Sequence, residues 1–405
     1  MAGKGLDGFF ENYLTQDSLF ENKKSMQASY VPEDIAHRDE QINQIANILA
    51  PALKVEKPSN IFIYGKTGTG KTLSVRYTTN HMLEVADQNN VPLKVFYINC
   101  KLKRVVDTEY RLIAEIARFF GKTIPATGLP TDEVYNIFYK ALDEKEQLLL
   151  LVLDEVDHLV KKTGDEIIYN LTRINAELKK SQLSIIGISN DLMFANHIDP
   201  RVKSSLSEEE ILFPPYNALQ IQDILRKRSA LAFKDGALDD GVIPKCAAYA
   251  AREHGDARRA IDLLRVAGEL ADRSQAENVK IEHIDEAEEK IEKERIVDIV
   301  KTQPKQFQAT LASIFSLVDK AGTKSVFTGD VYDVYKGLCP ASGLRPITQR
   351  RLSDIIAELD MLGLINAKVI SKGRFGRTRE IYLAIPSYLL SKVKDILAKE
   401  LEVTL

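Results

Sequence analysis

The sequence has no long apolar run and few cysteines, and each absence narrows the class of protein. No stretch approaches the roughly 20 apolar residues that a membrane-spanning helix needs, and the first residues lack the apolar core of a secretory signal. Cys100, Cys246 and Cys339 lie far apart and form no C-x-x-C motif. Such cysteines indicate small buried side chains in a reducing compartment rather than a metal site. We therefore expect a cytoplasmic protein without a membrane partner.

Length and charge point to several domains with different partners. The 405 residues are too many for one hydrophobic core, so two or three domains are expected. Residues 301–405 contain 16 basic and 10 acidic residues, a net charge of +6, whereas the first 300 contain 39 basic and 48 acidic residues, a net charge of −9. The basic C-terminal third predicts a polyanionic partner, and a basic solvated face is the alternative.

The strongest motif follows a short apolar run, Ile61 to Tyr64. The next eight residues fit the phosphate-loop pattern G-x-x-x-x-G-K-[ST] without a mismatch: Gly65, Lys66, Thr67, Gly68, Thr69, Gly70, Lys71 and Thr72. Glycine lets backbone N–H groups approach phosphates closely, and the following helix points its positive end at the same charge. Lys71 would reach the β- and γ-phosphates, and the Thr72 hydroxyl would hold Mg²⁺. The pattern predicts a site for ATP or ADP with Mg²⁺, and a glycine-rich turn that matches by chance is the alternative.

A second signal is a pair of carboxylates after a buried strand. The apolar run from Leu148 to Leu153 is typical of a central parallel strand, and it ends in Asp154 and Glu155. Because open α/β sheets bind ligands at the carboxyl ends of their strands, both carboxylates are expected beside the phosphate loop. Asp154 would hold Mg²⁺ through water, and Glu155 would polarise the attacking water. The alternative is a helix N-cap at Asp154 or Asp157.

Strand and helix patterns alternate from residue 60 to residue 213, which predicts an α/β domain with a mainly parallel sheet and helices on both faces. Asn190 ends another apolar strand at the same edge, as a contact for the γ-phosphate or water, or simply as a turn residue. The other candidates for nucleotide contacts are Val31, His37, Arg38, Leu73 and Tyr216. For Val31, His37 and Arg38 a plain helix entry is the alternative.

The C-terminal part reads as a winged helix-turn-helix. Helical patterns fill residues 217–301, and three more cover 308–320, 328–338 and 348–362, before strands at 364–370 and 380–385. The third helix would enter the major groove, and the basic turn between the strands would reach phosphates or the minor groove. The candidates for contacts with duplex DNA are Arg345, Thr348, Gln349, Arg350, Lys372, Arg374, Phe375, Arg377 and Arg379. The alternative is a winged helix that contacts protein.

These patterns divide the chain into four parts. We expect an N-terminal extension at residues 1–30, a nucleotide-binding α/β domain at 31–215, a helical domain at 216–301 and a winged-helix domain at 302–405.

From about Tyr13 to Leu390 the chain resembles the AAA+ ATPases, and within them the archaeal replication-initiator family, which is related to the largest subunit of the origin recognition complex and to the cell-division-control helicase-loading factor. The resemblance rests on an ordered series: Gly65–Thr72, Asp154–Asp157, Ile188–Asn190, Asp199–Val202, Gly255–Arg258 and the terminal winged helix. It implies an AAA+ domain with a helical lid, slow ATP hydrolysis and tight retention of ADP. It also implies, as partners on the nucleoid, double-stranded origin DNA, the replicative helicase and other initiator copies or paralogues.

The resemblance also suggests roles for single residues. Asn190 matches the sensor-one polar residue of the family. Arg258 matches the sensor-two arginine, which contacts the nucleotide from the lid, with Arg259 as the alternative if the register slips by one. Arg201 is the best match to the arginine finger, although Lys203–Leu206 stands where many AAA+ proteins carry a Ser-Arg pair.

The segment from Arg118 to Thr131 lies where the family has an initiator-specific helical insertion that touches DNA.

Two other functions stay open. One is a signalling ATPase switch that uses its winged helix for protein contacts; such proteins usually append repeats, and no internal repeat occurs here. The other is a clamp loader or a helicase motor, of which the ring-forming Holliday-junction motors also carry a terminal winged helix.

Overall fold

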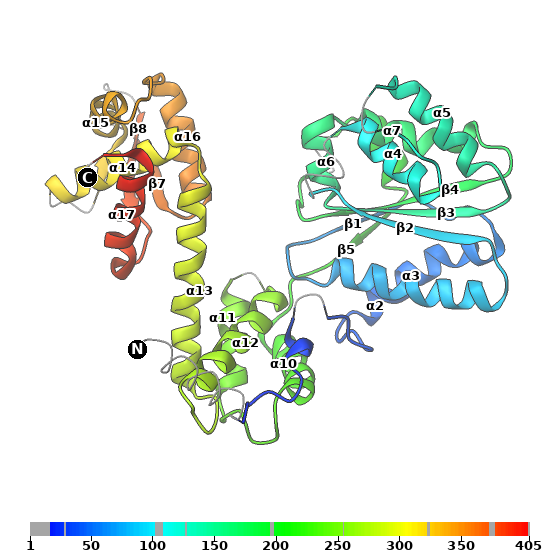
Figure 1. Cartoon of the computed structure of the whole chain (residues 1–405), viewed down its shortest axis with the longest axis horizontal. Coiled ribbons are helices and arrows are strands. Elements are labelled where there is room, and N and C mark those ends of the chain that lie inside the picture. The colour runs from blue at the N-terminus through cyan, green and yellow to red at the C-terminus, as the bar shows by residue number, and fades with distance from the viewer. Residues whose placement is uncertain are drawn as a thin grey trace, which may run out of the picture. The chain divides into compact units, whose positions relative to one another are not determined.

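The computed structural model describes residues 17–27, 30–101, 108–125, 128–194, 198–253, 255–321, 325–371 and 377–403. It divides into two compact units, one up to Ile284 and the other from Asp285, which are drawn in Figure 1 and described separately here. The predicted DNA contacts Lys372, Arg374 and Phe375 lie outside the described residues.

The first unit is built on a five-stranded parallel sheet in the order β2-β3-β4-β1-β5 (Figure 1). Its strands are β1 Ile61–Tyr64, β2 Leu93–Asn99, β3 Leu148–Asp154, β4 Gln182–Ser189 and β5 Glu209–Leu212. Strand β3 has a neighbour on each side and is buried along its whole length, which explains its unbroken apolar sequence. Because β4 lies between β3 and β1, the carboxyl ends of these three strands meet at one edge.

Helices cover both faces of this sheet. Helices α2 (Asp39–Leu49) and α3 (Lys71–Gln88) lie on one face (Figure 1). The other face carries α4 Glu109–Phe119, α5 Thr131–Leu142, α6 Val156–Thr163, α7 Glu166–Arg173 and α9 Pro200–Leu206, and short 3₁₀ turns occupy Ala50–Lys54 and Ile174–Ala176. Alternate residues of β3 point into the two cores, Leu149 and Leu151 into one, Leu148 and Leu150 into the other. The predicted parallel α/β architecture is confirmed.

A helical lid completes the first unit. It consists of α10 Ala218–Ala232, α11 Val242–Arg252, α12 Ala257–Arg273 and the start of α13 Ile281–Thr302. The chain enters α10 through a capping box, in which the side chains of Asn217 and Gln220 each accept the other's backbone N–H. A 3₁₀ turn at Lys23–Met26 packs on α10 and α12, so residues before the sheet domain contribute to the lid.

The second unit is a winged helix. Its helices are α14 Lys305–Ala321, α15 Thr328–Ala341, α16 Gln349–Met361 and α17 Leu390–Leu401, with a 3₁₀ turn at Ser387–Leu389. Strands β6 Val326–Phe327, β7 Ile365–Ser371 and β8 Arg377–Leu383 form an antiparallel sheet in the order β6-β8-β7. The apolar stripe of α16, which includes Leu352, Ile355 and Leu359, is buried in the core of this unit, as the helical spacing predicts.

One predicted boundary in this unit is wrong. We expected the turn between the two strands to run to Arg379, but β8 begins at Arg377 because antiparallel pairing continues to Ser371 opposite Arg377. Arg377 and Arg379 are therefore strand residues. The predicted division between lid and winged helix falls at the end of α13 and stays a prediction.

Among the helices that the structure describes, none has the length and apolar character needed to cross a membrane. All three cysteines are buried, in agreement with the small buried side chains that their spacing predicts.

Candidate functional site

The phosphate loop forms a tight cradle between β1 and α3. Gly70 caps α3 in the left-handed region, with φ 91°, and Thr69 Oγ1 donates a hydrogen bond to the carbonyl of Lys66 at 2.8 Å. Lys71 Nζ donates to the carbonyl oxygens of Gly65 and Lys66 at 2.7 and 2.8 Å. A Cβ on Gly68 would lie 1.7 Å from Asp256 Oδ1. The loop thus has the glycines and the N-terminal helix end that phosphate binding needs.

Lys71 is held in an unusual electrostatic environment. Burial lowers the pKa of its ammonium to about 8; the nearby Arg258 adds to that effect, and Asp154 opposes it. A buried ammonium that is bonded only to neutral carbonyls gains a strong partner when phosphate oxygens arrive. The side chain therefore fits the role of a phosphate ligand.

The predicted Mg²⁺ ligands Thr72 and Asp154 lie next to each other. Thr72 Oγ1 donates to Asp154 Oδ2 at 2.9 Å, and the hydroxyl of Tyr97 donates to the same carboxylate oxygen. Arg76 lies over the Tyr97 ring, 3.9 Å from its centroid. A hydroxyl beside a carboxylate is the donor set by which P-loop proteins hold Mg²⁺, so these residues fit the ion. Tyr97 comes from the neighbouring strand β2, and the motif pattern gave no signal for it.

Glu155 follows β3 in a strained conformation. Its φ is 55°, in the left-handed region that non-glycine residues rarely adopt, and such outliers cluster at functional sites. Its carboxylate lies 3.7 Å from Lys101 Nζ and 3.6 Å from His158 Nε2, and Oε2 makes no hydrogen bond within the described part of the chain. Asn190 directly follows β4. Strand β4 lies between β1, which leads into the phosphate loop, and β3, which ends in Asp154.

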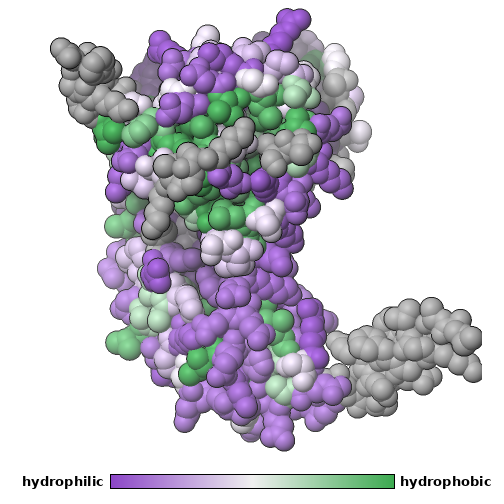
Figure 2. All heavy atoms as spheres, turned by 90° about the vertical axis from the view of Figure 1, so that its left-hand side faces the viewer, coloured by the Kyte–Doolittle hydropathy of each residue, from purple (hydrophilic) through white to green (hydrophobic). Residues whose placement is uncertain are grey.

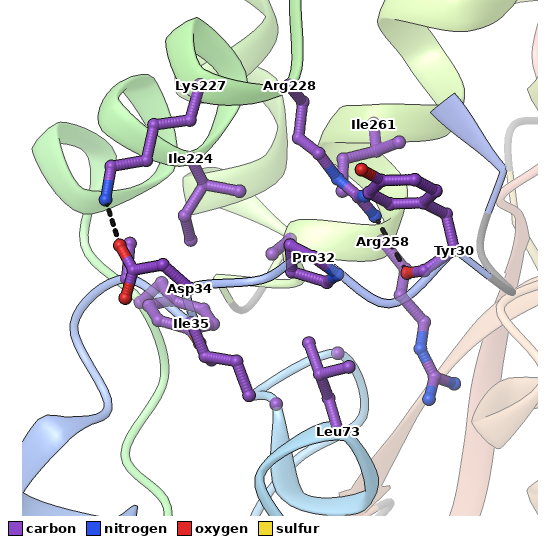
Figure 3. A pocket seen from close by; sticks show the side chains of 15 residues that line it. Tyr30, Pro32, Asp34, Ile35, Leu73, Ile224, Lys227, Arg228, Arg258 and Ile261 are labelled. Carbon is purple, nitrogen blue, oxygen red and sulfur yellow. Dashed lines mark hydrogen bonds and ion pairs between the residues drawn. The ribbon is translucent and has the colours of Figure 1, made fainter. Parts of the chain in front are cut away.

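The lid touches the phosphate loop directly. Asp256 caps α12 by accepting from the backbone N–H groups of Arg258 and Arg259, and Ala257 N donates to the Gly68 carbonyl at 3.3 Å. Arg258 lines the cavity beside the loop and points toward the side where Leu73 lies (Figure 3). Arg259, the alternative candidate, forms an ion pair with Glu253 at 3.1 Å.

A largely apolar cavity lies between the phosphate loop and the lid (Figure 3). Of the residues predicted for the nucleotide site, it is lined by Gly68, Gly70, Leu73, Tyr216 and Arg258. Sequence reasoning missed the following lining residues: Tyr30, Pro32, Asp34, Ile35, Ala36, Ile224, Lys227, Arg228, Ala257 and Ile261. The only sequence signal for them was their position just upstream of the phosphate loop or within the lid helices.

Val31, His37 and Arg38 do not line this cavity. Val31 is 46% exposed, and His37 Nε2 lies 3.2 Å from Asp223 of α10. Arg38 is buried and donates to the carbonyl oxygens of Thr69 and Pro214 at 2.8 and 2.6 Å, while its guanidinium lies 3.8 Å from the Tyr216 ring centroid. Arg38 thus stabilises the phosphate loop by linking Thr69 to the segment that follows β5. Figure 3 shows the neighbouring Pro32 and Ile35 on the cavity side.

Arg201 is not among the residues that line the nucleotide cavity. It lies on α9, its side chain is 73% exposed, and Asp199 holds it through an ion pair of 3.1 Å. An exposed arginine of this kind fits a role on a neighbouring molecule better than a role in its own site.

In the second unit, five of the predicted DNA contacts lie at or near the start of α16. Thr348 caps the helix, and its hydroxyl accepts from Arg351 N. Gln349 and Arg350 line a hollow together with Arg379 of β8, and the Arg379 guanidinium donates to the Ser353 carbonyl. Arg345 lies in the loop before α16. On the face of this unit drawn in Figure 2, hydrophilic residues mix with apolar ones.

Comparison with known protein families identifies the sheet domain, the lid and the winged helix. Residues 222–289 match the Cdc6 AAA+ ATPase-type lid domain, 298–392 match the CDC6 C-terminal winged helix domain, and 55–192 match an AAA domain. The ORC1-type DNA replication protein of Thermococcus onnurineus is 53% identical over 96% of this chain and 94% of its own length. The chain belongs to the ORC1/Cdc6 family. The ORC1-type DNA replication protein 1 of Methanosarcina mazei is 51% identical over 95% of this chain and 92% of its own length.

Solved structures of the ORC1/Cdc6 family agree with this fold. The Aeropyrum pernix ORC1 protein, solved in complex with DNA, is 42% identical, covers 95% of this chain and 98% of its own, and has a TM-score of 0.85. Cdc6p from Pyrobaculum aerophilum, at 22% identity and a TM-score of 0.58, supports the fold alone. The predicted archaeal replication-initiator family and its three-part architecture of AAA+ sheet, lid and winged helix are confirmed. As an ORC1/Cdc6-family member, the chain is an AAA+ ATPase and a DNA replication protein.

Proposed function

We propose that this chain is an ATP-dependent replication initiator that binds double-stranded origin DNA and helps to recruit or load the replicative helicase. The observation that carries the proposal is the presence of two sites in one chain: a phosphate-loop cavity closed by a lid, and a winged helix with basic residues at the start of α16. Relatives at 53% identity bear the name ORC1-type DNA replication protein, and a protein at 42% identity was solved with DNA.

In the nucleotide site, Lys71 exchanges its two carbonyl partners for phosphate oxygens, and Arg258 approaches the same charge from the lid. Thr72 and Asp154 would hold Mg²⁺, which would supply neutralisation of the phosphate charge. Glu155 and Asn190 orient the attacking water at the carboxyl ends of β3 and β4. The family resemblance implies slow, regulatory hydrolysis with retention of ADP, and the close approach of the lid to Gly68 is compatible with a nucleotide held under the lid.

We assign Arg201 to the nucleotide of a neighbouring initiator copy or paralogue, because its guanidinium is exposed and does not line the cavity of its own chain. The four domain divisions and the wing contacts Lys372, Arg374 and Phe375 belong to the same proposal. The helicase contact follows from the family's role, and a pull-down of the replicative helicase with the full chain tests it.

DNA binding is tested with the full chain in ATP and short duplexes from its own genome. Arg350→Ala is expected to weaken binding about tenfold, because a bidentate base contact or a phosphate contact of that size is lost. Lys392→Ala on α17 is the matched control, since it removes an exposed positive charge outside the α16 hollow. Equal binding by the wild type and Arg350→Ala would contradict the assigned surface.

A further inference from the structure

A buried arginine of the lid lines the nucleotide cavity beside Arg258. Arg228 lies on α10 of the lid, is only 7% exposed and lines the cavity between lid and phosphate loop. Its Nη2 donates to the Tyr30 carbonyl at 3.3 Å, and its guanidinium lies 4.5 Å from the centroid of the Tyr30 ring. Figure 3 shows Arg228 beside Tyr30 and Ile261 at one wall of the cavity.

The second terminal nitrogen of this guanidinium is unsatisfied. Nη1 is shielded from water and has no hydrogen-bond partner among the residues that the structure describes. An unpaired N–H of a buried charged group costs more free energy than almost any other polar atom left without a partner. Proteins therefore seldom keep such a group unless a ligand or a movement of the chain supplies the missing acceptor.

Most of the remaining cavity wall is apolar. Pro32, Ile35, Leu73, Ile224 and Ile261 provide apolar walls, which suit the faces of a flat aromatic ring. Lys227 donates a hydrogen bond to Asp34 at 2.5 Å, and both side chains are exposed. Arg258 points toward the phosphate-loop side (Figure 3). Arg228 is the lining residue that combines a buried charge with an unused donor.

Resting on the proposed nucleotide function, we propose that Arg228 is a specificity-determining residue that donates a hydrogen bond from Nη1 to a ring nitrogen of the purine base. A purine ring carries acceptor nitrogens at N1, N3 and N7 when the base is adenine. A guanidinium only donates, so the base edge that faces Arg228 is an edge with an acceptor and not the exocyclic amino group. Because Arg228 also holds Tyr30, the same contact links the base to the segment upstream of the phosphate loop and to the lid.

The test is nucleotide binding to the full chain by fluorescence anisotropy competition, with ATP, 1-deaza-ATP, 3-deaza-ATP and 7-deaza-ATP. Each analogue lacks one acceptor nitrogen. The wild type is expected to bind one of the three about tenfold more weakly than ATP, because a hydrogen bond to a charged donor is lost. Arg228→Met is expected to bind ATP about tenfold more weakly and to bind that analogue as well as it binds ATP.

The matched control is Arg226→Met, two positions earlier on the same helix. Arg226 pairs with Asp223 at 3.0 Å on the exposed side and does not line the base cavity, so this variant is expected to keep wild-type discrimination. Arg228→Lys keeps the charge but loses the planar fork, and thermal unfolding reports whether each variant is folded. If Arg228→Met does not fold, the loss of discrimination in a folded Arg228→Lys carries the test.

Two results would overturn the proposal. One is a wild type that binds ATP and all three analogues equally. The other is a folded Arg228→Met that keeps the wild-type preference, which would leave Arg228 with its contact to Tyr30 alone. A wild-type chain that binds no ATP would instead contradict the nucleotide function itself, so the two failures are distinguishable.

Discussion

A single buried ammonium sets the pH dependence expected at the residue scale. Burial lowers the pKa of Lys71 to about 8, and bound phosphates favour its charged form, so nucleotide binding takes up a proton as the pH rises through 8. Affinity for ATP is expected to be about tenfold weaker at pH 9 than at pH 7. Calorimetry in two buffers of different ionisation enthalpy measures the proton uptake directly.

Lys71→Arg provides the discriminating variant for this prediction, because a guanidinium stays protonated across the range. Its affinity for ATP is expected to be independent of pH between 7 and 9. An affinity for ATP that does not change with pH in the wild type would contradict the assignment of Lys71.

The lowered pKa of Lys71 also affects stability. Between about pH 8 and the unfolded value of 10.5, the unfolded chain binds more protons at this residue than the folded chain does, so Lys71 makes the free energy of unfolding rise with pH.

Glu155 is the residue whose loss should separate binding from chemistry. Glu155→Gln keeps the shape of the side chain and removes its ability to accept a proton, so hydrolysis is expected to fall at least about a hundredfold while ATP binding is retained. Phosphate release and anisotropy binding measure the two quantities. Glu144→Gln, an exposed glutamate before β3, is the control. Unchanged hydrolysis in Glu155→Gln would exclude it as the group that prepares water.

The role of a residue could be predicted from the sequence where it belongs to a contiguous motif. It could not be predicted where the residue meets the site through contacts between segments that are distant in the sequence. The eight phosphate-loop residues are recognisable because their chemistry requires one order of residue types. Arg38, a predicted nucleotide contact, bonds Thr69 of the phosphate loop and Pro214, and this arrangement depends on where residue 214 returns after β5. Tyr97 and Arg228 carry no motif, because their positions follow from strand pairing and lid packing.

At the element scale, the start of α12 is seated on the phosphate loop, and Gly68 makes this possible. A Cβ there would meet Asp256 Oδ1 at 1.7 Å, and the φ of +71° is already unfavourable for other residues. Gly68→Ala is expected to displace α12 and to weaken ATP binding by at least about tenfold. Gly236→Ala is the control, because its φ of +75° gives similar strain with open space around it, so it should cost about 1 kcal/mol of stability and leave binding unchanged.

The loop before α16 is held by side chains from two other helices. Ile347 N donates to the Tyr335 hydroxyl at 3.3 Å, the Tyr332 hydroxyl donates to the Ile347 carbonyl at 3.2 Å, and Gln306 Nε2 donates to the Arg345 carbonyl at 3.1 Å. These bonds fix the point at which α16 begins. They were not predictable, because apolar periodicity locates helices and says nothing of which hydroxyl reaches which loop.

Tyr335→Phe tests this anchoring. The buried hydroxyl also donates to Gln306, so its removal is expected to lower the free energy of unfolding by about 1 kcal/mol and to weaken duplex binding several-fold. Tyr388→Phe, on a half-exposed tyrosine, is the control. A loss of stability with unchanged DNA affinity would show that the anchor serves the fold alone.

Across the whole molecule, the sequence predicted the kinds of domain better than their limits. Alternating strand and helix patterns, then helices, then helices with a hairpin, were sufficient for the architecture. The limits are harder because α13 is one continuous helix from Ile281 to Thr302, whereas the compact units divide at Ile284 and Asp285. Helical periodicity does not change at such a point, so no local signal marks it.

Duplex binding by the full chain in ATP and in ADP, across a salt series, decides whether this protein is a nucleotide-controlled DNA-binding initiator. We predict tight binding to one region of its own genome, with an affinity that differs between ATP and ADP. The logarithm of the binding constant is expected to fall linearly with the logarithm of the salt concentration. Weak binding that is equal for all duplexes and both nucleotides would contradict the initiator function, and would leave an AAA+ ATPase whose winged helix contacts protein.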